Sequence, residues 1–457
     1  MMEKNRVGSS FRDPSGFVFA KDGVLYRQVN RFYKNEYDHL LGSGLYERLV
    51  ESKLLLKHSE VDLGQKNKDT YKIIQPEPVE FISYPYEWCF SQMKDAALAA
   101  LRIQKTALDY GMSLKDCSAY NMQLHHGRPV LIDTLSFSLH DGREQWTAYR
   151  QFCQHFLAPL ALMAEKDVRL SQLSRIFMDG IPLDLASSLL PYKSRLNHGL
   201  LLHVHLHSKA QRHLSGRKIK AEKTGRLGSL RGLVDSLEST VTKLRWSPDR
   251  TLWSGYYPLQ SNYSNKSLEV KKEIVKKLIA KARTSNVLDL GSNTGLFSRI
   301  PSSMGIPTLS VDSDPSCVEL NYLHAKECGE EYLTPVLADI QNPTPSIGWE
   351  NKERASFLER ARPDTVMALA LVHHLALGNN LPLDMIASFF SRICKKLIIE
   401  FIPKEDSNAQ RLLSSKADIF HGYNLKNFEE EFSKYFTIAS KEEIPGTLRT
   451  IYLMLIK

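Results

Sequence analysis

The feature that most constrains this chain is a short apolar strand that ends at an acid and turns through two glycines, in residues 287–298, VLDLGSNTGLFS. Asp289 places a carboxylate at the end of the strand, where a parallel sheet presents its ligand-binding groups. Gly291 and Gly295 have no Cβ, so the backbone can turn sharply there and a ligand can approach closely. The segment predicts a buried strand, a ligand-binding loop and a helix that begins after the loop.

Asn293 stands between the two glycines, at a position that suits it because asparagine tolerates left-handed backbone angles better than most residues. The spacing is not G-x-G-x-x-G, so a dinucleotide pyrophosphate is not the first expectation. A glycine loop of this kind also occurs in plain strand-turn-helix units. The segments downstream must therefore decide between the two interpretations.

A second apolar segment, residues 308–311, ends at Asp312, which follows Asp289 by 23 positions. This is close to the offset of about 20 residues at which a second strand presents an acid to ribose hydroxyls. Asp312 is therefore the expected ribose ligand. Asp314 is the rival, although a carboxylate just before Pro315 more often caps the helix that begins there.

A third and a fourth segment repeat the pattern. Residues 334–338 end at Asp339, whose carboxylate can accept a hydrogen bond from an adenine amino group while Ile340 packs on the base. Residues 364–371 run into the sequence Val-His-His-Leu at 372–375. Apolar segments separated by helix-length stretches predict a parallel sheet with ligands at the carboxyl ends of the strands.

The remaining sequence completes this sheet. Residues 396–402 predict a fifth strand and residues 424–435 a helix. Two β-rich segments, 436–444 and 449–456, flank Pro445-Gly446, a dipeptide typical of turns. The chain is therefore expected to end in an antiparallel hairpin.

Residues from about 250 to 457 resemble a class I S-adenosylmethionine-dependent methyltransferase, whose Rossmann-like seven-stranded sheet ends in such a hairpin. The resemblance implies S-adenosylmethionine as the cofactor and an acceptor, small molecule or macromolecule, that the sequence does not identify. More specifically, residues 253–263 and 399–406 are similar to a bacterial group named for a nodulation host-specificity protein. The resemblance carries the cofactor site over to Asp289, Gly291, Asn293, Gly295, Asp312, Asp339 and Ile340.

Methyl transfer needs a positioned nucleophile and a base that removes its proton. His373 and His374 follow the fourth predicted strand, resemble a dipeptide frequent in family members that methylate small molecules, and titrate in the right range. Glu400 is the second candidate base. Each of the three also has a structural interpretation, as a packed, capping or surface residue. Four aromatic residues also have two interpretations: Trp253, Tyr256, Tyr257 and Tyr263 could line the substrate site, or they could pack within the domain.

Residues 208–231 carry eight basic side chains against Glu222 alone, so most of the net charge of +9 falls in one segment. With Gly216, Gly225 and Gly228 it is expected to be a solvated linker, and an anionic partner is the alternative. No apolar stretch reaches about 18 residues, so no membrane span is expected. The six cysteines show no paired spacing, and the chain begins without an apolar leader, so a cytoplasmic location is expected.

The amino-terminal half carries a different motif. Asp116 and Asn121 are five positions apart, and an apolar run delivers Asp133 twelve positions later. This pattern is similar to the catalytic loop of protein kinases, in which one acid orients a hydroxyl and the other two residues clamp Mg²⁺. The resemblance implies a degenerate nucleotide site, with Mg-ATP as its ligand. Chance spacing in an unrelated helical domain is the alternative.

The flanks of this motif agree with a small β-rich lobe followed by a helical lobe. Residues 17–29 predict two strands about an Asp-Gly turn, 46–56 a helix, 79–82 a strand and 93–108 a long helix. The departures from kinases are large: there is no G-x-G-x-x-G loop, and Arg27 stands where a lysine is expected. A degenerate module is therefore expected rather than an active kinase. The expected function is methyl transfer to an unidentified acceptor, with the amino-terminal domain as its recognition module. A bifunctional kinase-methyltransferase and a non-catalytic binding scaffold are the alternatives.

The expected organisation is an α+β, kinase-like or substrate-recognition domain over residues 1–207, a basic linker and helix over 208–250, and an α/β methyltransferase domain over 251–457. His203, His205 and His207 would share a face only in a strand. Their surroundings suit a helix, so no metal site is predicted.

Overall fold

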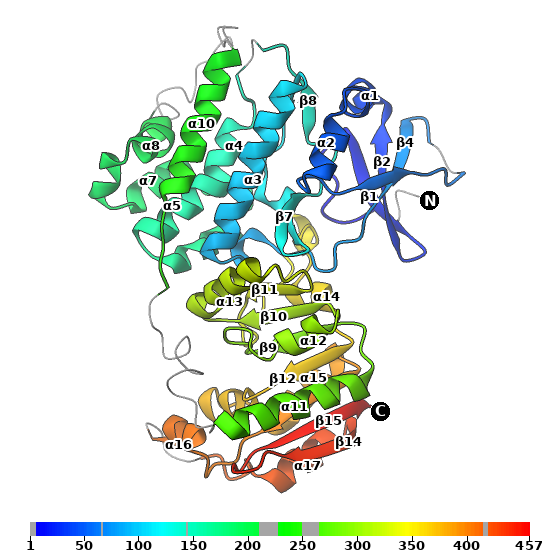
Figure 1. Cartoon of the computed structure of the whole chain (residues 1–457), viewed down its shortest axis with the longest axis vertical. Coiled ribbons are helices and arrows are strands. Elements are labelled where there is room, and N and C mark those ends of the chain that lie inside the picture. The colour runs from blue at the N-terminus through cyan, green and yellow to red at the C-terminus, as the bar shows by residue number, and fades with distance from the viewer. Residues whose placement is uncertain (1–5, 65–66, 143–144, 210–226, 249–264, 415–418) are drawn as a thin grey trace. The chain divides into compact units, whose positions relative to one another are not determined.

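The computed structural model divides the chain into two compact units (Figure 1). Unit 1 contains Met1–Ser247 together with Ser346–Ala355, and unit 2 contains Pro248–Pro345 and Ser356–Lys457. The residues described are 6–64, 67–142, 145–209, 227–248, 265–414 and 419–457. Most of the predicted basic linker and all four aromatic residues from Trp253 to Tyr263 lie outside them.

Unit 1 begins with a four-stranded antiparallel sheet in the order β1-β2-β4-β3. The strands are β1 Gly16–Lys21, β2 Val24–Asn30, β3 His58–Glu60 and β4 Thr70–Pro76. Asp22 and Gly23 join the first two strands, both at positive φ, which is the two-residue hairpin predicted from the sequence. The strand predicted at residues 79–82 is wrong. The strand ends at Pro76, because proline has no N–H for the ladder and Pro78 follows it closely.

Helices η2 Arg31–Tyr33, α1 Lys34–Gly42 and α2 Leu45–Glu51 follow the first hairpin. The helix predicted for residues 46–56 is therefore only half correct. After Glu51 the chain runs alongside β7 (Arg128–Leu131). The Leu131 N–H donates to the Leu54 carbonyl, and the Leu56 N–H donates to the Leu131 carbonyl. These long-range hydrogen bonds replace the helical ones.

The long helix predicted at residues 93–108 is confirmed as α3, Phe90–Asp109. It lies beside α10, Leu227–Lys243, as Figure 1 shows, so the helix that the sequence assigned to the linker packs within unit 1. Lys105 of α3 forms ion pairs with Asp235 and Glu238 of α10. The short helix η3, Pro85–Glu87, precedes α3. Four short strands follow α3: β5 Met112–Leu114, β6 Met122–His125, β7 and β8 Phe137–Leu139. The short helix η4, Ala119–Asn121, lies between β5 and β6.

The rest of unit 1 is helical. Its elements are α4 Tyr149–Phe152, η5 Cys153–Leu157, α5 Ala158–Glu165, η6 Val168–Gln172, α6 Leu173–Ile176, α7 Leu183–Leu189, η7 Tyr192–Leu196, α8 His198–Leu200 and η8 Leu201–Leu206. His203 and His205 lie in helical backbone, as the sequence predicted. The hydroxyls of Tyr149 and Ser236 flank the first imidazole, and those of Ser187 and Ser194 flank the second.

Unit 2 contains a seven-stranded sheet in the order β11-β10-β9-β12-β13-β15-β14. The parallel strands are β9 Val287–Leu290, β10 Thr308–Asp312, β11 Leu333–Leu337, β12 Thr365–Ala368 and β13 Lys396–Phe401. The antiparallel hairpin is β14 Phe436–Glu443 and β15 Thr450–Ile456. This is the sheet expected of a class I methyltransferase, and all seven predicted strands are confirmed. The fourth ends at Ala368 rather than 371, because Ala370 turns the chain at a φ of 51°.

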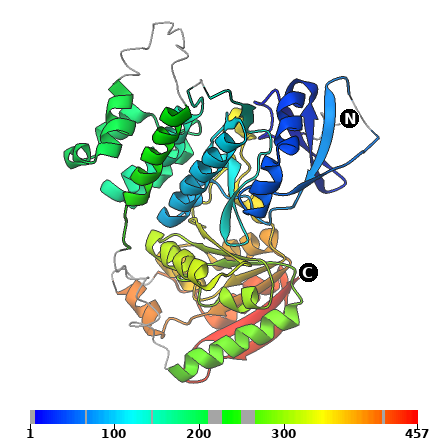
Figure 2. The same ribbon diagram turned by 45° about the horizontal axis from the view of Figure 1, so that its top comes forward.

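The sheet is covered on both faces by helices. The described helices of unit 2 are α11 Asn265–Ala282, α12 Arg299–Ser303, α13 Pro315–Cys328, α14 Phe357–Ala361, η11 His374–Gly378, α15 Leu383–Ile393, α16 Ser407–Leu413 and α17 Leu425–Ser433. Figure 2 shows α11, in green, lying along the carboxyl-terminal hairpin, in red. Val275 and Leu278 of α11 pack with Ile398 of the sheet, and Phe428 and Tyr452 pack together elsewhere in the unit. The short helix η10, Trp349–Asn351, belongs to unit 1.

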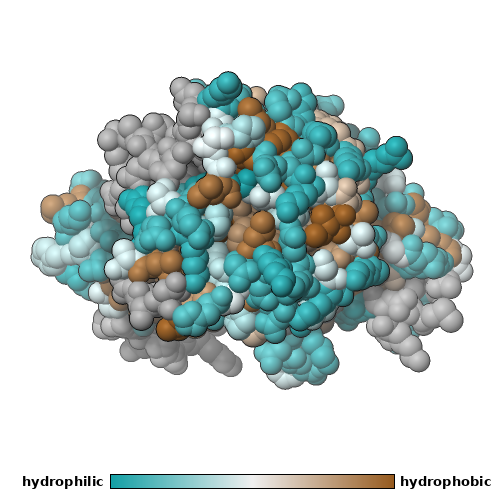
Figure 3. All heavy atoms as spheres, turned by 90° about the horizontal axis from the view of Figure 1, so that it is seen from below, coloured by the Kyte–Doolittle hydropathy of each residue, from teal (hydrophilic) through white to brown (hydrophobic). Residues whose placement is uncertain are grey.

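The described helices include none with the length and apolar content that a bilayer crossing requires. The face seen in Figure 3 is mostly hydrophilic, with hydrophobic residues in small separate groups. Scattered exposed apolar residues of this kind are ordinary on protein surfaces.

Candidate cofactor site

The carboxyl ends of adjacent strands of the unit 2 sheet carry the predicted acids. Asp289 lies in β9 opposite Ser310 of β10, and its carboxylate accepts a hydrogen bond of 2.6 Å from Ser298 Oγ. Only 2% of Asp289 is exposed. Burial raises the pKa of Asp289 to about 7, opposed by the Ser298 hydrogen bond and aided by the charge of Asp312. Such a shifted carboxylate at a strand end is typical of a functional site.

The loop after β9 folds as its sequence predicts. Gly291, Asn293 and Gly295 all have positive φ, of 72°, 53° and 80°. Asp312, at the end of β10, accepts backbone hydrogen bonds from Asn293 at 2.7 Å and Asp314 at 2.9 Å. Burial raises the pKa of Asp312, and these backbone hydrogen bonds oppose the rise. The acid therefore fixes the loop to the neighbouring strand.

The two glycines are required for different reasons. A Cβ at Gly295 would stand 2.2 Å from Asn321 Oδ1, so this glycine permits close packing against α13. Gly291 is exposed, and a Cβ there would meet only Leu371 at 3.3 Å. Arg299 holds the loop from the other side by donating to the Thr294 carbonyl at 2.7 Å. The backbone at Gly291 is thus rigidly held and open to a ligand.

The third predicted acid, Asp339, follows β11 and is exposed. Its Oδ1 accepts from the Gln341 backbone at 2.9 Å, and Ile340 beside it is half-buried. Asp314, the rival ribose ligand, caps α13 by accepting from the Ser316 backbone at 2.8 Å. The capping interpretation of Asp314 is therefore confirmed.

One polar atom in the loop has its hydrogen-bonding capacity unused. Ser292 Oγ is buried and has no hydrogen-bond partner in the part of the chain that the structure describes. Buried hydroxyls are normally paired, so this one fits a bound polar ligand. Together with the acids and the open backbone at Gly291, it makes a cradle whose donor and acceptor set suits a ligand with an ammonium group and hydroxyls.

His373 and His374 follow β12, and their ring centroids are 4.1 Å apart. His373 is 1% exposed, and neither ring nitrogen has a hydrogen-bond partner among the described residues. Burial, reinforced by the charges of Arg449 and Lys271, holds the pKa of His373 well below its usual value. Burial also lowers the pKa of His374 to about 4. Both imidazoles are therefore neutral at physiological pH.

Glu400, the other candidate base, is fully buried in β13 and paired. Lys271 of α11 donates to its Oε2 at 2.7 Å, and Arg449 lies 3.9 Å from its Oε1. Arg449 in turn binds Asp406 through two hydrogen bonds, of 2.7 and 3.0 Å. Burial lowers the pKa of Lys271, while the Glu400 carboxylate opposes this change. The structure thus brings Glu400 into a buried network of ions.

Sequence reasoning missed the two cations of this network. Lys271 carried a usable signal, because it falls in helical register with the buried Val275 and Leu278 on the apolar face of α11. A lysine on that face requires a buried partner. Arg449 carried no comparable signal, since it stands just before the last strand as any surface arginine would.

The two acids of the kinase-like motif in unit 1 also lie near each other. Asp133 pairs with Arg27 at 2.8 Å, and both side chains are nearly buried. Asp116 accepts from Gln151 at 2.8 Å, and Asn121 donates to Ser136 at 3.4 Å. Burial raises the pKa of Asp133, with Arg27 opposing the rise and Asp116 adding to it. The two acids are therefore close enough to interact, and one of them already has a cationic partner.

The chain is similar in sequence to a known protein and in structure to several solved ones. No protein-family model matches the chain. Nodulation protein NoeA of Rhizobium meliloti strain 1021 is 32% identical over 98% of this chain and 95% of its own length. Among solved structures, the bifunctional kinase-methyltransferase WbdD matches 47% of this chain and 45% of its own, at 16% identity and a TM-score of 0.32.

Two further structures match the chain. The magnesium protoporphyrin IX methyltransferase ChlM of Synechocystis, solved with bound SAH, covers 43% of this chain and 89% of its own, at 17% identity and a TM-score of 0.30. A Nostoc punctiforme protein described as a putative O-methyltransferase covers 46% and 61%, at 16% identity and a TM-score of 0.34.

The strand order of unit 2, with its terminal hairpin and glycine loop, defines a methyltransferase-like protein of class I. The NoeA relative extends along nearly the whole chain and confirms the likeness to nodulation proteins that the sequence indicated. The chain belongs to the family of nodulation protein NoeA. The kinase-like interpretation of unit 1 stays a prediction.

Proposed function

We propose that this chain transfers the methyl group of S-adenosylmethionine to an acceptor, and that unit 2 performs the reaction. The observation that carries the proposal is the exposed turn at Gly291 between the buried Asp289 and the half-buried Asp312, at the ends of neighbouring strands. Ligands of open α/β sheets bind at such strand ends.

Each group of the cofactor has a matching residue. Asp289, when ionised, pairs with the ammonium of the methionine part. Asp312 accepts from the ribose hydroxyls with the same oxygens that hold the loop, since each carboxylate oxygen has two lone pairs. Asp339 accepts from the adenine amino group, and Ile340 packs on the base. The bound cofactor supplies a methyl group on a positively charged sulfur.

His373 serves the acceptor in this proposal. Its imidazole is neutral, and neither ring nitrogen has a hydrogen-bond partner among the described residues, which is costly for a buried ring unless a ligand binds it. It therefore accepts a hydrogen bond from the acceptor and orients the nucleophile. Glu400 is less suited to take a proton, because Lys271 already holds its carboxylate. In this proposal Glu400 and Lys271 keep the strand ends in position.

Calorimetric titration of the full chain with S-adenosylmethionine tests the cofactor assignment. Asp312→Ala should weaken binding at least roughly tenfold, since it removes charge-assisted hydrogen bonds. Asp364→Ala is the matched control, because Asp364 lies at the opposite end of the sheet, before β12, and pairs with Lys396. Equal affinity of the two variants, or no binding by the unmodified chain, would contradict the proposal.

Labelled cofactor incubated with the protein and a cell lysate identifies the acceptor. Label should enter one class of product, small molecule, protein or nucleic acid, and His373→Ala should abolish that transfer while leaving cofactor affinity unchanged. The four predicted aromatic residues from Trp253 to Tyr263 are candidates for the acceptor wall. In this proposal unit 1 recognises the acceptor, and the basic residues of segment 208–231 attract an anionic one.

A second activity, phosphoryl transfer by unit 1, is favoured by one observation: Asp116 and Asp133 are close enough for their charges to interact. Two such acids can hold Mg²⁺ with ATP. Arg27 opposes this function, because its cation already pairs with Asp133. Binding of Mg-ATP that is lost in Asp133→Ala supports a bifunctional protein, and no binding leaves unit 1 as a recognition module.

A further inference from the structure

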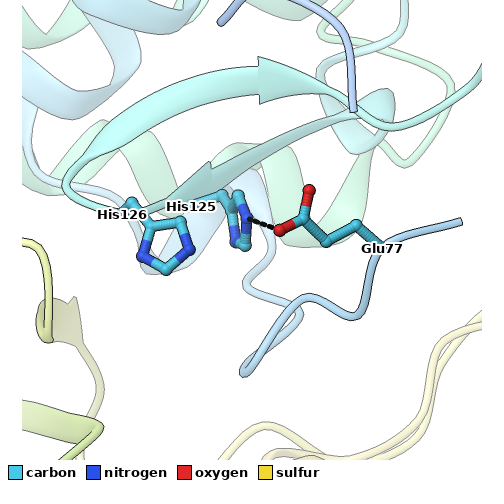
Figure 4. A group of neighbouring side chains, drawn as sticks. All are labelled: Glu77, His125 and His126. Carbon is cyan, nitrogen blue, oxygen red and sulfur yellow. Dashed lines mark ion pairs between the residues drawn. The ribbon is translucent and has the colours of Figure 1, made fainter. Parts of the chain in front are cut away.

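Three side chains with metal-ligating atoms, none of them used above, converge in unit 1. Glu77 follows the end of β4, His125 ends β6, and His126 is the next residue in the chain. One ligand atom of each lies within 4.8 Å of the other two. Figure 4 shows the two imidazoles side by side, with the Glu77 carboxylate opposite His125.

The backbone under these residues is firmly held. His125 pairs with Arg128 across the hairpin, so the connection is only His126-Gly127, with φ of 48° and 73°. This is the two-residue turn that usually contains Asn-Gly, and histidine is among the few other residues that tolerate its first position. Glu77 donates its N–H to the Lys57 carbonyl at 2.8 Å. The three side chains therefore start from fixed positions.

The side chains differ in freedom. His125 is 13% exposed, whereas Glu77 is 48% exposed and can rotate. Their closest atoms, Nε2 and Oε1, are 3.9 Å apart, and the imidazole centroids are separated by 4.1 Å. Ligand atoms around a tetrahedral zinc ion stand about 3.4 Å apart, which follows from bonds of about 2.1 Å. The three ligand atoms lie within 4.8 Å of one another, so the side chains, that of Glu77 among them, must move inward to reach this spacing.

We propose that Glu77, His125 and His126 bind a divalent first-row metal ion, with zinc as the best match. Two imidazoles and one carboxylate are a common zinc ligand set, and three protein ligands leave one position open. Glu80 lies near enough to His126 for their charges to interact. The ion would join the last strand of the amino-terminal sheet to the β6–β7 hairpin.

Calorimetric titration of the chelator-stripped full chain with zinc chloride tests the proposal. One ion per chain should bind at this site, and Glu77→Gln and His126→Asn should each weaken its affinity at least roughly tenfold. Asparagine is chosen because it accepts the φ of 48° at that position. With cobalt in place of zinc, the visible spectrum should be that of a four-coordinate ion and should be lost in both variants.

The matched control is the double variant His324→Asn, Cys328→Ser. The Cys328 Sγ and His324 Nε2 atoms of these two exposed residues of α13 are 3.7 Å apart, so the pair could compete for zinc. The control should leave stoichiometry and affinity unchanged. The proposal is overturned if zinc does not bind, if binding is lost only in the control, or if both site variants bind as tightly as the parent. Glu77→Gln changes a half-exposed side chain, so circular dichroism should show an unchanged fold.

Discussion

At the scale of single residues, Asp289 shows how burial prepares a carboxylate for a ligand. Its pKa of about 7 is far above the ordinary value for aspartate, because the side chain is 2% exposed. The folded protein therefore holds this proton more tightly than the unfolded chain does. The stabilisation is complete below the unfolded pKa of about 4 and is lost as the pH rises through about 7.

Asp289→Asn should consequently become more stable than the parent as the pH rises. Since asparagine has no charge to bury, the difference in unfolding free energy should grow by on the order of 2 kcal/mol between about pH 5 and about pH 8. Thermal unfolding across this range measures it. A difference that does not depend on pH would show that Asp289 is ionised in the folded protein throughout. Cofactor affinity of the parent should rise over the same interval, as the carboxylate gains its charge.

The buried Lys271–Glu400 pair allows a second prediction. Glu400→Gln leaves the Lys271 ammonium buried without a full counter-charge, so the protein should lose about 3–5 kcal/mol of stability. Urea unfolding measures this loss. The control is Glu442→Gln, which breaks the exposed Lys277–Glu442 pair and should cost less than about 1 kcal/mol. If Glu400→Gln stops methyl transfer while stability is unchanged, Glu400 is a base and not a structural ion.

The residues that sequence could locate are those whose position is fixed locally. Asp312 and Gly291 are specified by the end of a strand and by a turn, both visible within a few residues. Arg449 reaches its partner Asp406 from 43 positions away, and Lys271 reaches Glu400 from 129. Such contacts depend on strand order, which the local sequence does not state.

At the scale of elements, the parallel strands of unit 2 were predictable because buried strands are continuous apolar runs. Their ends were less predictable. The run that includes β12 continues through Leu371, yet the strand stops at Ala368 because Ala370 adopts a left-handed φ of 51°. Alanine rarely adopts this conformation, which costs about 1–2 kcal/mol. Strain of this kind beside Gly291 and His373 is consistent with a constraint imposed by function.

Ala370→Gly should therefore stabilise unit 2 by about 0.5–1 kcal/mol, because glycine removes the strain but loses more entropy on folding. The melting temperature measures this gain. Ala280→Gly, at an exposed position within α11, is the control and should destabilise by about 1 kcal/mol. If both substitutions destabilise equally, Ala370 is not strained. Weaker cofactor or acceptor binding in Ala370→Gly would link the strain to the site.

At the scale of the whole molecule, the two units are not two consecutive parts of the sequence, because unit 1 includes a short segment from within the other unit's sequence. Residues 346–355 lie within the sequence of the methyltransferase fold but belong to unit 1. Arg12 binds the carboxylate of Glu353 through hydrogen bonds of 2.9 and 3.0 Å, and the guanidinium of Arg354 lies over the ring of Tyr120. No local pattern distinguishes this segment from an ordinary loop after β11, so its place in unit 1 could not be predicted from the sequence.

Glu353 is the residue through which this arrangement can be tested. It is 4% exposed, and although burial raises its pKa, hydrogen bonds from Arg12 and Trp349 bring the pKa below the ordinary value. Glu353→Ala removes these charge-assisted hydrogen bonds and should destabilise unit 1 by about 1–3 kcal/mol. Hydrogen exchange of residues 346–355 should accelerate, while the affinity of unit 2 for S-adenosylmethionine should not change.

Glu350→Ala is the control in the same segment, because the Glu350 side chain is 60% exposed and its ion pair within the described part of the chain is with the exposed Lys352. Exposed pairs contribute little, so stability should change by less than about 0.5 kcal/mol. Equal hydrogen exchange in the two variants would mean that the Arg12–Glu353 contact does not hold the segment to unit 1. A loss of cofactor affinity in Glu353→Ala alone would mean instead that unit 1 influences methyl transfer through these ten residues.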